Sequence, residues 1–255
     1  MGIASGDFDG DGDEDLFVTN IISETFVLYV NDGKGGFEDR RTAARLAHPT
    51  VARTGFGTEW IDYDNDGWLD LFVANGAVNT LEQQRGAPSP YRMTNQLFRN
   101  TGDGRFEETS AAAGPAFARP DIGRGAAFGD IDNDGDIDIV VTNNNGPVKL
   151  LINQTGARRH WLQVRLQQPS GDRFGLGARL GIERPGRPTI WRRVRTDGSY
   201  LSAGDARVHV GLGATEAVEA VIVEWADGHQ ERWREIGVDR VVTLRRGTGV
   251  MDTAR

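Results

Sequence analysis

An aspartate-rich loop that occurs three times constrains the fold of this chain more than any other feature of its sequence. The first copy reads GDFDGDGDEDLFV at residues 6–18, with aspartate at every second position from Asp7 to Asp15. Two like charges about 4 Å apart repel by roughly 4 kcal/mol near a protein surface. An acidic tail avoids this cost by staying extended, but here the apolar segment Leu16-Phe17-Val18 follows at once. The sequence therefore indicates that a multivalent cation neutralises the loop.

The spacing of the aspartates is typical of a calcium loop. Such a loop supplies side-chain oxygens from positions 1, 3 and 5 and a backbone carbonyl from position 7, and it has glycine at position 6. The three copies, 7–15, 62–70 and 130–138, share aspartate at positions 1, 3, 5 and 9 and glycine at position 6. The predicted ligands of three Ca²⁺ sites are Asp7, Asp9, Asp11, Asp13 and Asp15; Asp62, Asp64, Asp66, Trp68 and Asp70; and Asp130, Asp132, Asp134, Asp136 and Asp138.

These loops are not EF-hands. An EF-hand needs a bidentate glutamate at position 12 and flanking helices, whereas position 12 here is Val18, Val73 and Val141. The segments DLFVTN, DLFVAN and DIVVTN that follow are short, rich in β-branched and aromatic residues, and bounded by Asn, which predicts strands. The loops therefore join β-strands, and the aspartate at position 9 closes each site.

The repeat extends beyond the loops and predicts propeller blades. A Gly- and Ala-rich strand precedes each loop, two strands follow it, and the first two repeats end with the motif N-x-G-x-G-x-F at residues 31–37 and 100–106. Four strands per unit, at spacings of 55 and 68 residues, are typical of a β-propeller. The third repeat lacks the last motif, and three blades cannot close a ring of the usual four to eight. We therefore expect this chain to be the C-terminal part of a longer propeller, with the remaining blades supplied by a longer chain or a second chain.

From Trp161 onward the pattern changes to short alternating segments such as HWLQVRL and AVEAVIVEW, separated by Gly, Asp and Pro. This pattern predicts a second all-β unit resembling a sandwich. The expected fold is all-β: three blades of four-stranded antiparallel sheet over residues 1–155, a β-sandwich-like domain over 156–250, and a tail at 251–255.

Composition and charge limit the possible functions. The 255 residues include 34 glycines, no cysteine and no apolar run long enough to span a membrane. The N-terminal residues lack the basic and apolar regions of a signal peptide. Residues 1–153 carry 25 acidic and 12 basic side chains, and residues 154–255 carry 12 and 17. The basic excess of the second part comes without stacking platforms or a known motif, so we expect no nucleic-acid partner.

An extracellular polysaccharide-acting enzyme, either a lyase or a hydrolase on a calcium propeller scaffold, is the alternative to a binding function. No Ser/His/Asp arrangement or zinc-type histidine cluster occurs among His48, His160, His209 and His229. His209 lies between two valines in a predicted strand and is interpreted as structural. Carboxylates that bind Ca²⁺ stay ionised and transfer protons poorly. We therefore predict no catalytic residues.

The aspartate loops resemble FG-GAP/VCBS-type calcium propeller repeats. The segments FGLGARL, DGSYLSAGDARVHVGLG and VIVEWADGHQE resemble an ASPIC/UnbV domain. Together, over roughly residues 1–247, the chain is similar to the cartilage acidic protein family and its bacterial relatives. The resemblance implies an extracellular or cell-surface, calcium-binding, non-enzymatic protein that contacts other molecules. Family members usually have more blades, and often a histidine where this chain has Ala77.

We conclude from the sequence that this is a calcium-stabilised extracellular binding or adhesion module with an unknown protein or glycan partner. A long polar loop at residues 76–94, with Tyr91 and Arg92, is the expected recognition surface, since long loops on a rigid scaffold often bind partners.

Overall fold

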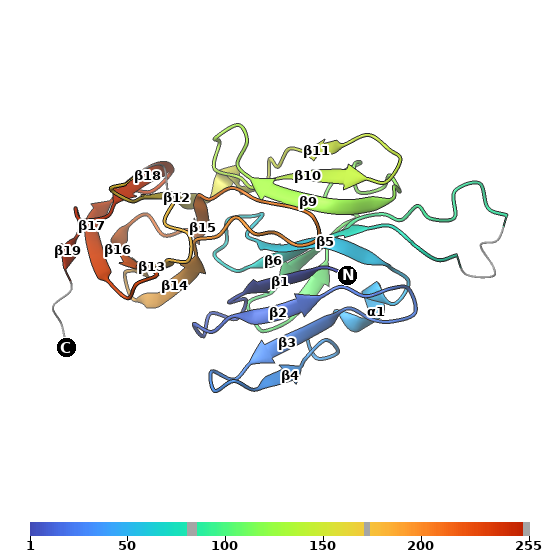
Figure 1. Ribbon diagram of the computed structural model, residues 1–255, viewed down its shortest axis with the longest axis horizontal. Coiled ribbons are helices and arrows are strands. Elements are labelled where there is room, and N and C mark those ends of the chain that lie inside the picture. The colour runs from blue at the N-terminus through green and yellow to red at the C-terminus, as the bar shows by residue number, and fades with distance from the viewer. Residues whose placement is uncertain (81–85, 171–173, 252–255) are drawn as a thin grey trace.

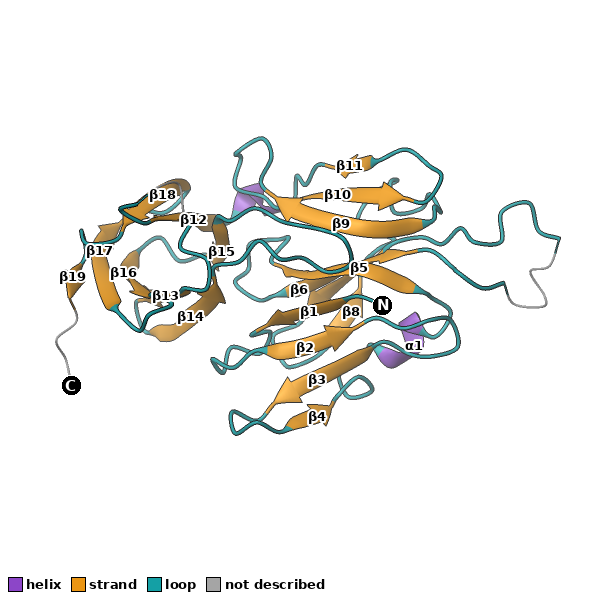
Figure 2. Cartoon of the chain, in the orientation of Figure 1, coloured by secondary structure: helices purple, strands orange, loops and turns teal. Residues whose placement is uncertain are grey.

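The computed structural model describes residues 1–80, 86–170 and 174–251, and its regular secondary structure consists almost entirely of strands (Figures 1 and 2). The strands of the first part are β1 (Ile3–Gly6), β2 (Asp15–Val18), β3 (Val27–Asn31), β4 (Phe37–Asp39), β5 (Gly55–Ile61), β6 (Asp70–Asn75), β7 (Gln96–Asn100), β8 (Phe106–Glu108), β9 (Gly123–Gly129), β10 (Asp138–Asn143) and β11 (Lys149–Leu151). The strands of the second part are β12 (His160–Gln167), β13 (Arg179–Arg184), β14 (Arg187–Arg193), β15 (Val208–Gly213), β16 (Val218–Glu224), β17 (Gln230–Ile236), β18 (Arg240–Arg245) and β19 (Val250–Met251). One helical turn, α1 (Ala47–Thr50), and one 3-10 turn, η2 (Gly156–Arg158), complete the elements.

The first part forms three small antiparallel sheets, as the repeat predicts. Their strand orders are β1-β2-β3-β4, β5-β6-β7-β8 and β9-β10-β11. The third sheet has three strands among the described residues, in agreement with the absence of the N-x-G-x-G-x-F motif. Figure 1 shows the three sheets side by side, with the second between the other two. The predicted all-β fold with propeller blades is confirmed.

Strand register places the three aspartate loops at equivalent points. The position-9 aspartate always pairs with the last residue of the blade's first strand: Asp15 with Gly6, Asp70 with Ile61 and Asp138 with Gly129. Each loop therefore connects neighbouring antiparallel strands at the same end of its blade.

Neighbouring blades are held together by apolar cores. The core between the first two blades gathers Phe17, Phe26, Leu28, Trp60 and Phe98, with Trp60 stacked on Phe8 at 5.6 Å between ring centroids. A second core, around Phe72, Leu97 and Val141, joins the second and third blades. These side chains alternate along their strands because successive residues of a strand point to opposite faces.

The second part consists of two further sheets that enclose their own core. The sheets have strand orders β15-β12-β18 and β14-β13-β16-β17-β19, and the pairing of β12 with β18 is parallel. Sixteen buried residues fill the space between them, including Leu162, Leu180, Val210 and Val221. Strand β19 extends by Met251 into the predicted tail, and residues 252–255 lie outside the described residues.

One segment of the second part, residues 195–205, runs along the first strands of the blades. Ser199 is 4% exposed and contacts the carbonyl of Phe56, whose ring packs edge-on against Tyr200 at 4.8 Å. Ser202 Oγ accepts a hydrogen bond from the Ala126 amide at 2.9 Å. The two parts of the chain are therefore joined by a long inserted segment as well as by the covalent link at 153–160.

The expected recognition loop at 76–94 begins and ends in ordered structure. Gly76 bridges to Arg92, and the Ala77 amide donates to the Tyr91 carbonyl at 2.9 Å. Arg124 donates to the carbonyls of Gly76 and Ala77, which fixes the base of the loop. Residues 81–85 of this loop lie outside the described residues. Across the part of the chain that the structure describes, no helix is long and apolar enough to cross a membrane.

In the second and third blades, an asparagine at or just after the end of the third strand connects the blade to the blade before it. The amide of Asn100 donates to the carbonyl of Phe8 in the first blade at 2.9 Å and to that of Leu69 in its own loop at 3.1 Å. Asn153 donates in the same way to the carbonyl of Tyr63 in the second blade at 2.7 Å. The equivalent Asn31 donates to Glu14 of its own blade.

We expect Asn100→Ala to lower the free energy of unfolding by about 3 kcal/mol, because two buried carbonyls lose their donor and each unsatisfied group costs about 1–3 kcal/mol. The matched control is Asn31→Ala, at the same motif position but half-buried, for which about 1 kcal/mol is expected. Chemical denaturation of both variants measures the difference. Equal losses would show that the contact between blades contributes nothing.

Candidate metal centre

Each aspartate loop brings three carboxylates together. The groups are Asp7, Asp9 and Asp15; Asp62, Asp64 and Asp66; and Asp130, Asp132 and Asp138. Within each group, one oxygen atom of every residue lies within 4.8 Å of the others. The structure thus has three acidic groups that can hold a metal ion, at equivalent places in three blades.

The position-1 aspartate shapes the loop through backbone amides. Its two oxygens accept hydrogen bonds from within the loop, including the amide of the position-6 glycine. The distance from this amide to the carboxylate is 3.1 Å for Gly12 and Asp7, 2.8 Å for Gly67 and Asp62, and 3.1 Å for Gly135 and Asp130. The glycines have φ of +97°, +96° and +94°, a conformation that glycine adopts without steric cost. Glycine at position 6 is therefore required by the turn.

The position-9 aspartate links the loop to the rest of its blade. Asp70 is fully buried and accepts from the amide of Tyr63 at 3.2 Å and from that of Asn100 at 2.8 Å. Asp15 and Asp138 make the equivalent two contacts, and the second donor is the amide of Asn31 or of Asn153. Each loop is thus closed by its ninth residue, and the side chains of Asn100 and Asn153 also reach the neighbouring blade.

Burial makes the ionisation of these carboxyl groups unfavourable. It raises the pKa of Asp15 and of Asp62 to about 7, and that of Asp70 well above its ordinary value, while nearby aspartates add to the effect. The pKa of Asp7 and of Asp9 is raised for the same reason. Since a raised carboxyl pKa reports an unfavourable anion, the loops need positive charge in order to be ionised at neutral pH.

One oxygen atom of the first loop indicates whether the loop suits a cation. Asp9 Oδ1 is buried and has no hydrogen-bond partner among the described residues, although Asp9 lies in the group with Asp7 and Asp15. A buried carboxylate oxygen without a donor is expensive, and oxygen ligands of this kind are what calcium and magnesium prefer. The first loop therefore fits a hard divalent cation.

The second loop differs from the others because two arginines reach it. Arg99 bonds Asp64 and Asp66 at 2.9 Å each, and Arg159 bonds Asp64 at 2.7 Å. Among the described residues, no ion pair involves the position-3 and position-5 aspartates of the first and third loops. The second loop thus carries part of its neutralising charge within the protein.

The remaining predicted ligands lie in the loops but outside the three acidic groups. They are Asp11, Asp13, Trp68, Asp70, Asp134 and Asp136. Asp11, Asp66 and Asp134 each accept from the amide of the position-7 residue at 2.9–3.0 Å. The Asp136 carboxylate accepts from the Asn65 side chain and from the Gly156 amide, so it joins the second and third loops. Their role as ligands stays a prediction.

The second part of the chain covers all three loops. Over the first loop, Arg179 donates to the carbonyl of Gly12 and lies 4.4 Å from the centre of the Trp191 ring, and Arg193 pairs with Glu14 at 3.0 Å. These contacts come from β13 and β14.

The second loop receives residues from β14 and β15. The Gly213 amide donates to the carbonyl of Asn65 at 2.9 Å, and His209 Nε2 lies 2.6 Å from Asn65 Oδ1. Burial, with the charges of Arg192 and Arg207, lowers the pKa of His209 to about 3. The His209 side chain is therefore neutral, and its structural role stays a prediction.

The third loop is held by polar and aromatic contacts. Gln163 donates to Asp130 Oδ2 at 2.8 Å, and Arg207 donates to the carbonyl of Asp130 at 2.7 Å. A Cβ atom on Gly135 would lie 2.0 Å from the Trp161 ring, so only glycine allows the indole to cover this turn. Gln163 and Arg207 belong to no motif that would have singled them out in the sequence.

The family models separate the chain at the same change of pattern. The model of the FG-GAP-like repeat matches residues 7–73 and 86–141, which include all three aspartate loops, and the ASPIC and UnbV model matches residues 168–250. The chain combines FG-GAP-like repeats with an ASPIC and UnbV domain. The resemblance found in the sequence is therefore confirmed, and the two parts are called the repeats and the ASPIC/UnbV domain below.

Three relatives are similar to most of this chain. Cartilage acidic protein 1 of Xenopus tropicalis is 29% identical over 232 residues, which cover 89% of this chain and 34% of that protein. The human and mouse proteins of the same name are 27% and 28% identical, again over 89% of this chain and over 33% and 34% of their own length. The chain is homologous to these proteins and spans about a third of their length.

In metal-free protein, the raised pKa values predict a stability that falls with pH. Between about pH 4 and pH 7, a carboxyl group whose pKa is about 7 in the folded protein binds more protons in the folded state than in the unfolded state. The free energy of unfolding therefore decreases as the pH rises through this range. Thermal melts after chelation are expected to give a lower midpoint at about pH 8 than at about pH 5. The control is the same pair of melts in excess calcium, where the fall is expected to be small. Parallel falls with and without calcium would contradict this.

Proposed function

We propose that the chain is a calcium-stabilised, non-catalytic binding module that acts outside cells. One observation carries the proposal: the same oxygen-rich loop occurs in three blades, and the ASPIC/UnbV domain lies against all three copies. Calcium then has a structural role, because it neutralises carboxylates at the joint between the two parts of the molecule.

In this proposal, each ion is held by one loop. The side chains at positions 1, 3, 5 and 9 and the carbonyl at position 7 supply the oxygens, in the sets already given for the sequence. When bound, calcium supplies the positive charge that ionised buried carboxylates need. Affinities of about 10⁻⁴–10⁻³ M suffice for extracellular calcium modules.

An extracellular setting and a binding role are proposed from the relatives. The curated relatives are named as acidic proteins of cartilage. The surface we propose for a protein or glycan partner is the described part of the loop at 76–94, where Val78 and Tyr91 are 42% and 41% exposed. The loop extends away from the sheets in Figure 1, and its base is fixed by Arg124.

We also propose that further blades of the same repeat pack on the outer faces of the first and third blades. In the first blade Phe8, Phe26 and Leu28 are at most 3% exposed, because the second blade covers them. The residues at the same places in the third blade, Ile131, Val148 and Leu150, are 50%, 60% and 52% exposed. On the opposite side, Phe37 is 47% exposed whereas its counterpart Phe106 is 2% exposed. Contiguous exposed apolar residues of this kind mark interaction surfaces.

Asp9→Asn tests the role of calcium most sharply. Asp9 Oδ1 has no partner in the structure, so the change is expected to leave metal-free stability unchanged or to raise it slightly. In saturating calcium the variant is expected to lose about 1–3 kcal/mol relative to the parent chain, the usual cost of losing a charged ligand or partner.

The matched control is Asp13→Asn, in the same loop, at a position where only the backbone carbonyl is predicted to bind. It is expected to retain the full calcium response. Thermal and chemical unfolding with calcium and with chelator provide the measurement. A calcium response of Asp9→Asn equal to that of the parent chain would sink the proposal.

Leu150→Lys tests the outer face of the third blade. The parent chain is expected to associate with rising concentration, and the variant to associate less, because a charge on an apolar face opposes packing. Light scattering over a concentration series measures this, with Val51→Lys as a control at an exposed valine outside these faces. A parent chain that stays monomeric throughout would count against an interaction surface.

A further inference from the structure

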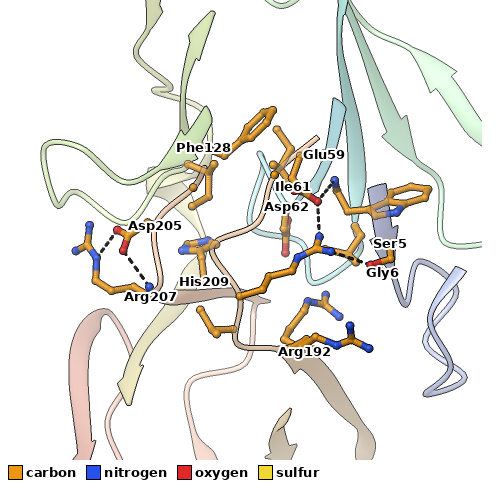
Figure 3. A pocket seen from close by; sticks show the side chains of 18 of the residues that line it. Ser5, Gly6, Glu59, Ile61, Asp62, Phe128, Arg192, Asp205, Arg207 and His209 are labelled. Carbon is orange, nitrogen blue, oxygen red and sulfur yellow. Dashed lines mark hydrogen bonds and ion pairs between the residues drawn. The ribbon is translucent and has the colours of Figure 1, made fainter. Parts of the chain in front are cut away.

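A cavity of about 160 Å³ lies between the repeats and the ASPIC/UnbV domain. Its wall is formed on one side by the first strands of all three blades and on the other by β12 to β15 and the segment between β14 and β15 (Figure 3). The exposed residues Arg193 and Asp197 are part of its lining, so the cavity is open to solvent. One water molecule occupies about 30 Å³ in the liquid, so the space suits a molecule of monosaccharide size.

One arginine of the cavity, Arg192, has a free donor. Of the other arginines that line the cavity, Arg193, Arg195 and Arg207 pair with Glu14, Glu59 and Asp205, and Arg179 donates to the carbonyl of Gly12 and lies against the Trp191 ring. Arg192 donates only to the carbonyls of Trp191 and Gly67, at 2.8 and 3.3 Å, and its Nε is buried with no partner. Among the described residues, no carboxylate forms an ion pair with Arg192. A half-buried guanidinium of this kind favours an anionic partner.

Two other lining residues have polar atoms without partners although their side chains are more than nine-tenths buried. Trp60 is 6% exposed and its Nε1 hydrogen has no acceptor, and Gln163 is 1% exposed and its Oε1 has no donor. The Gln163 amide already donates to Asp130, which fixes Oε1 as the free acceptor. Buried polar groups are nearly always paired, so both atoms indicate a ligand or bound water.

His209 adds a second acceptor, and hydrogen bonding decides its tautomer. The Asn65 amide donates to Gly135 and Asp136, so Asn65 Oδ1 is an acceptor for His209 Nε2 at 2.6 Å. Nε2 must therefore carry the proton. Nδ1 is then an unprotonated acceptor, and it is buried without a partner. Figure 3 shows His209, Asp62 and Arg192 around the same cavity.

We propose that this cavity binds a small hydroxylated carboxylate of the uronic-acid class. Arg192 Nε and the Trp60 indole donate to the oxygens of the acid, and Gln163 Oε1 and His209 Nδ1 accept from hydroxyl groups. The inference rests on the proposed calcium sites in one respect: Asp7, Asp62 and Asp130 also line the cavity, and Asp7 and Asp62 attract Arg192, so an anion is favoured beside Arg192 only when the loops are neutralised.

Isothermal titration of the full chain with glucuronate, in saturating calcium, tests this site. Glucose is the matched neutral ligand. Arg192→Met removes the unpaired charge and keeps the apolar stem, and it is expected to weaken glucuronate binding about tenfold or more, as for loss of a charged hydrogen bond. Trp60→Phe removes the donor and retains an aromatic ring. The control variant is Arg187→Met, at an exposed arginine on the same strand outside the cavity.

Binding of glucuronate in preference to glucose, weakened in Arg192→Met and in Trp60→Phe but not in Arg187→Met, is the expected result. No binding of either sugar, or equal binding of both, would overturn the proposal, and the free groups would then be hydrogen-bonded by water alone. A melt of each variant with calcium and with chelator separates the two proposals. A normal calcium response without glucuronate binding rejects this site and leaves the calcium sites standing.

Discussion

The electrostatic cost of the aspartate loops is the constraint on which the rest of this structure depends. Three carboxylates gather in each loop, at the end of the blade where the ASPIC/UnbV domain lies. Backbone amides bond some of their oxygens, but amides carry no net charge, so the repulsion and the loss of solvation remain. The second loop meets part of this need with Arg99 and Arg159. The first and third loops have no such arginine within the described residues, and for them the proposal assigns the charge to calcium.

This arrangement links local charge to global architecture. The position-9 aspartate bonds the asparagine amide of the third strand, and the side chain of the same asparagine bonds the previous blade, as Asp70, Asn100 and Phe8 show. The ASPIC/UnbV domain then bonds the loops through Gln163 and Arg207. The cation that we propose for each loop would therefore stabilise a strand, a contact between blades and a contact between domains at once.

Much of this organisation was predictable from the sequence. The spacing of the aspartates predicts the carboxylate groups, and the alternation of apolar and polar residues predicts the strands, because both patterns repeat over a few residues. The sequence could not predict that the ASPIC/UnbV domain covers the loops, since Gln163 and His209 meet them only through contacts 33 and 144 residues apart. The cavity was hidden for the same reason: Arg192 and Trp60 become neighbours of one space only after both parts have folded.

The central claim is that a cation holds the blades and the ASPIC/UnbV domain together at the loops. Amide hydrogen exchange in calcium and in chelator tests it most directly. We expect the amides of Gly12, Gly135 and the third-strand asparagines to be protected in calcium and to exchange much faster after chelation. The amides of β13 and β16, inside the ASPIC/UnbV sheet, should change little. Protection of the loop amides that is the same in both conditions would contradict the account.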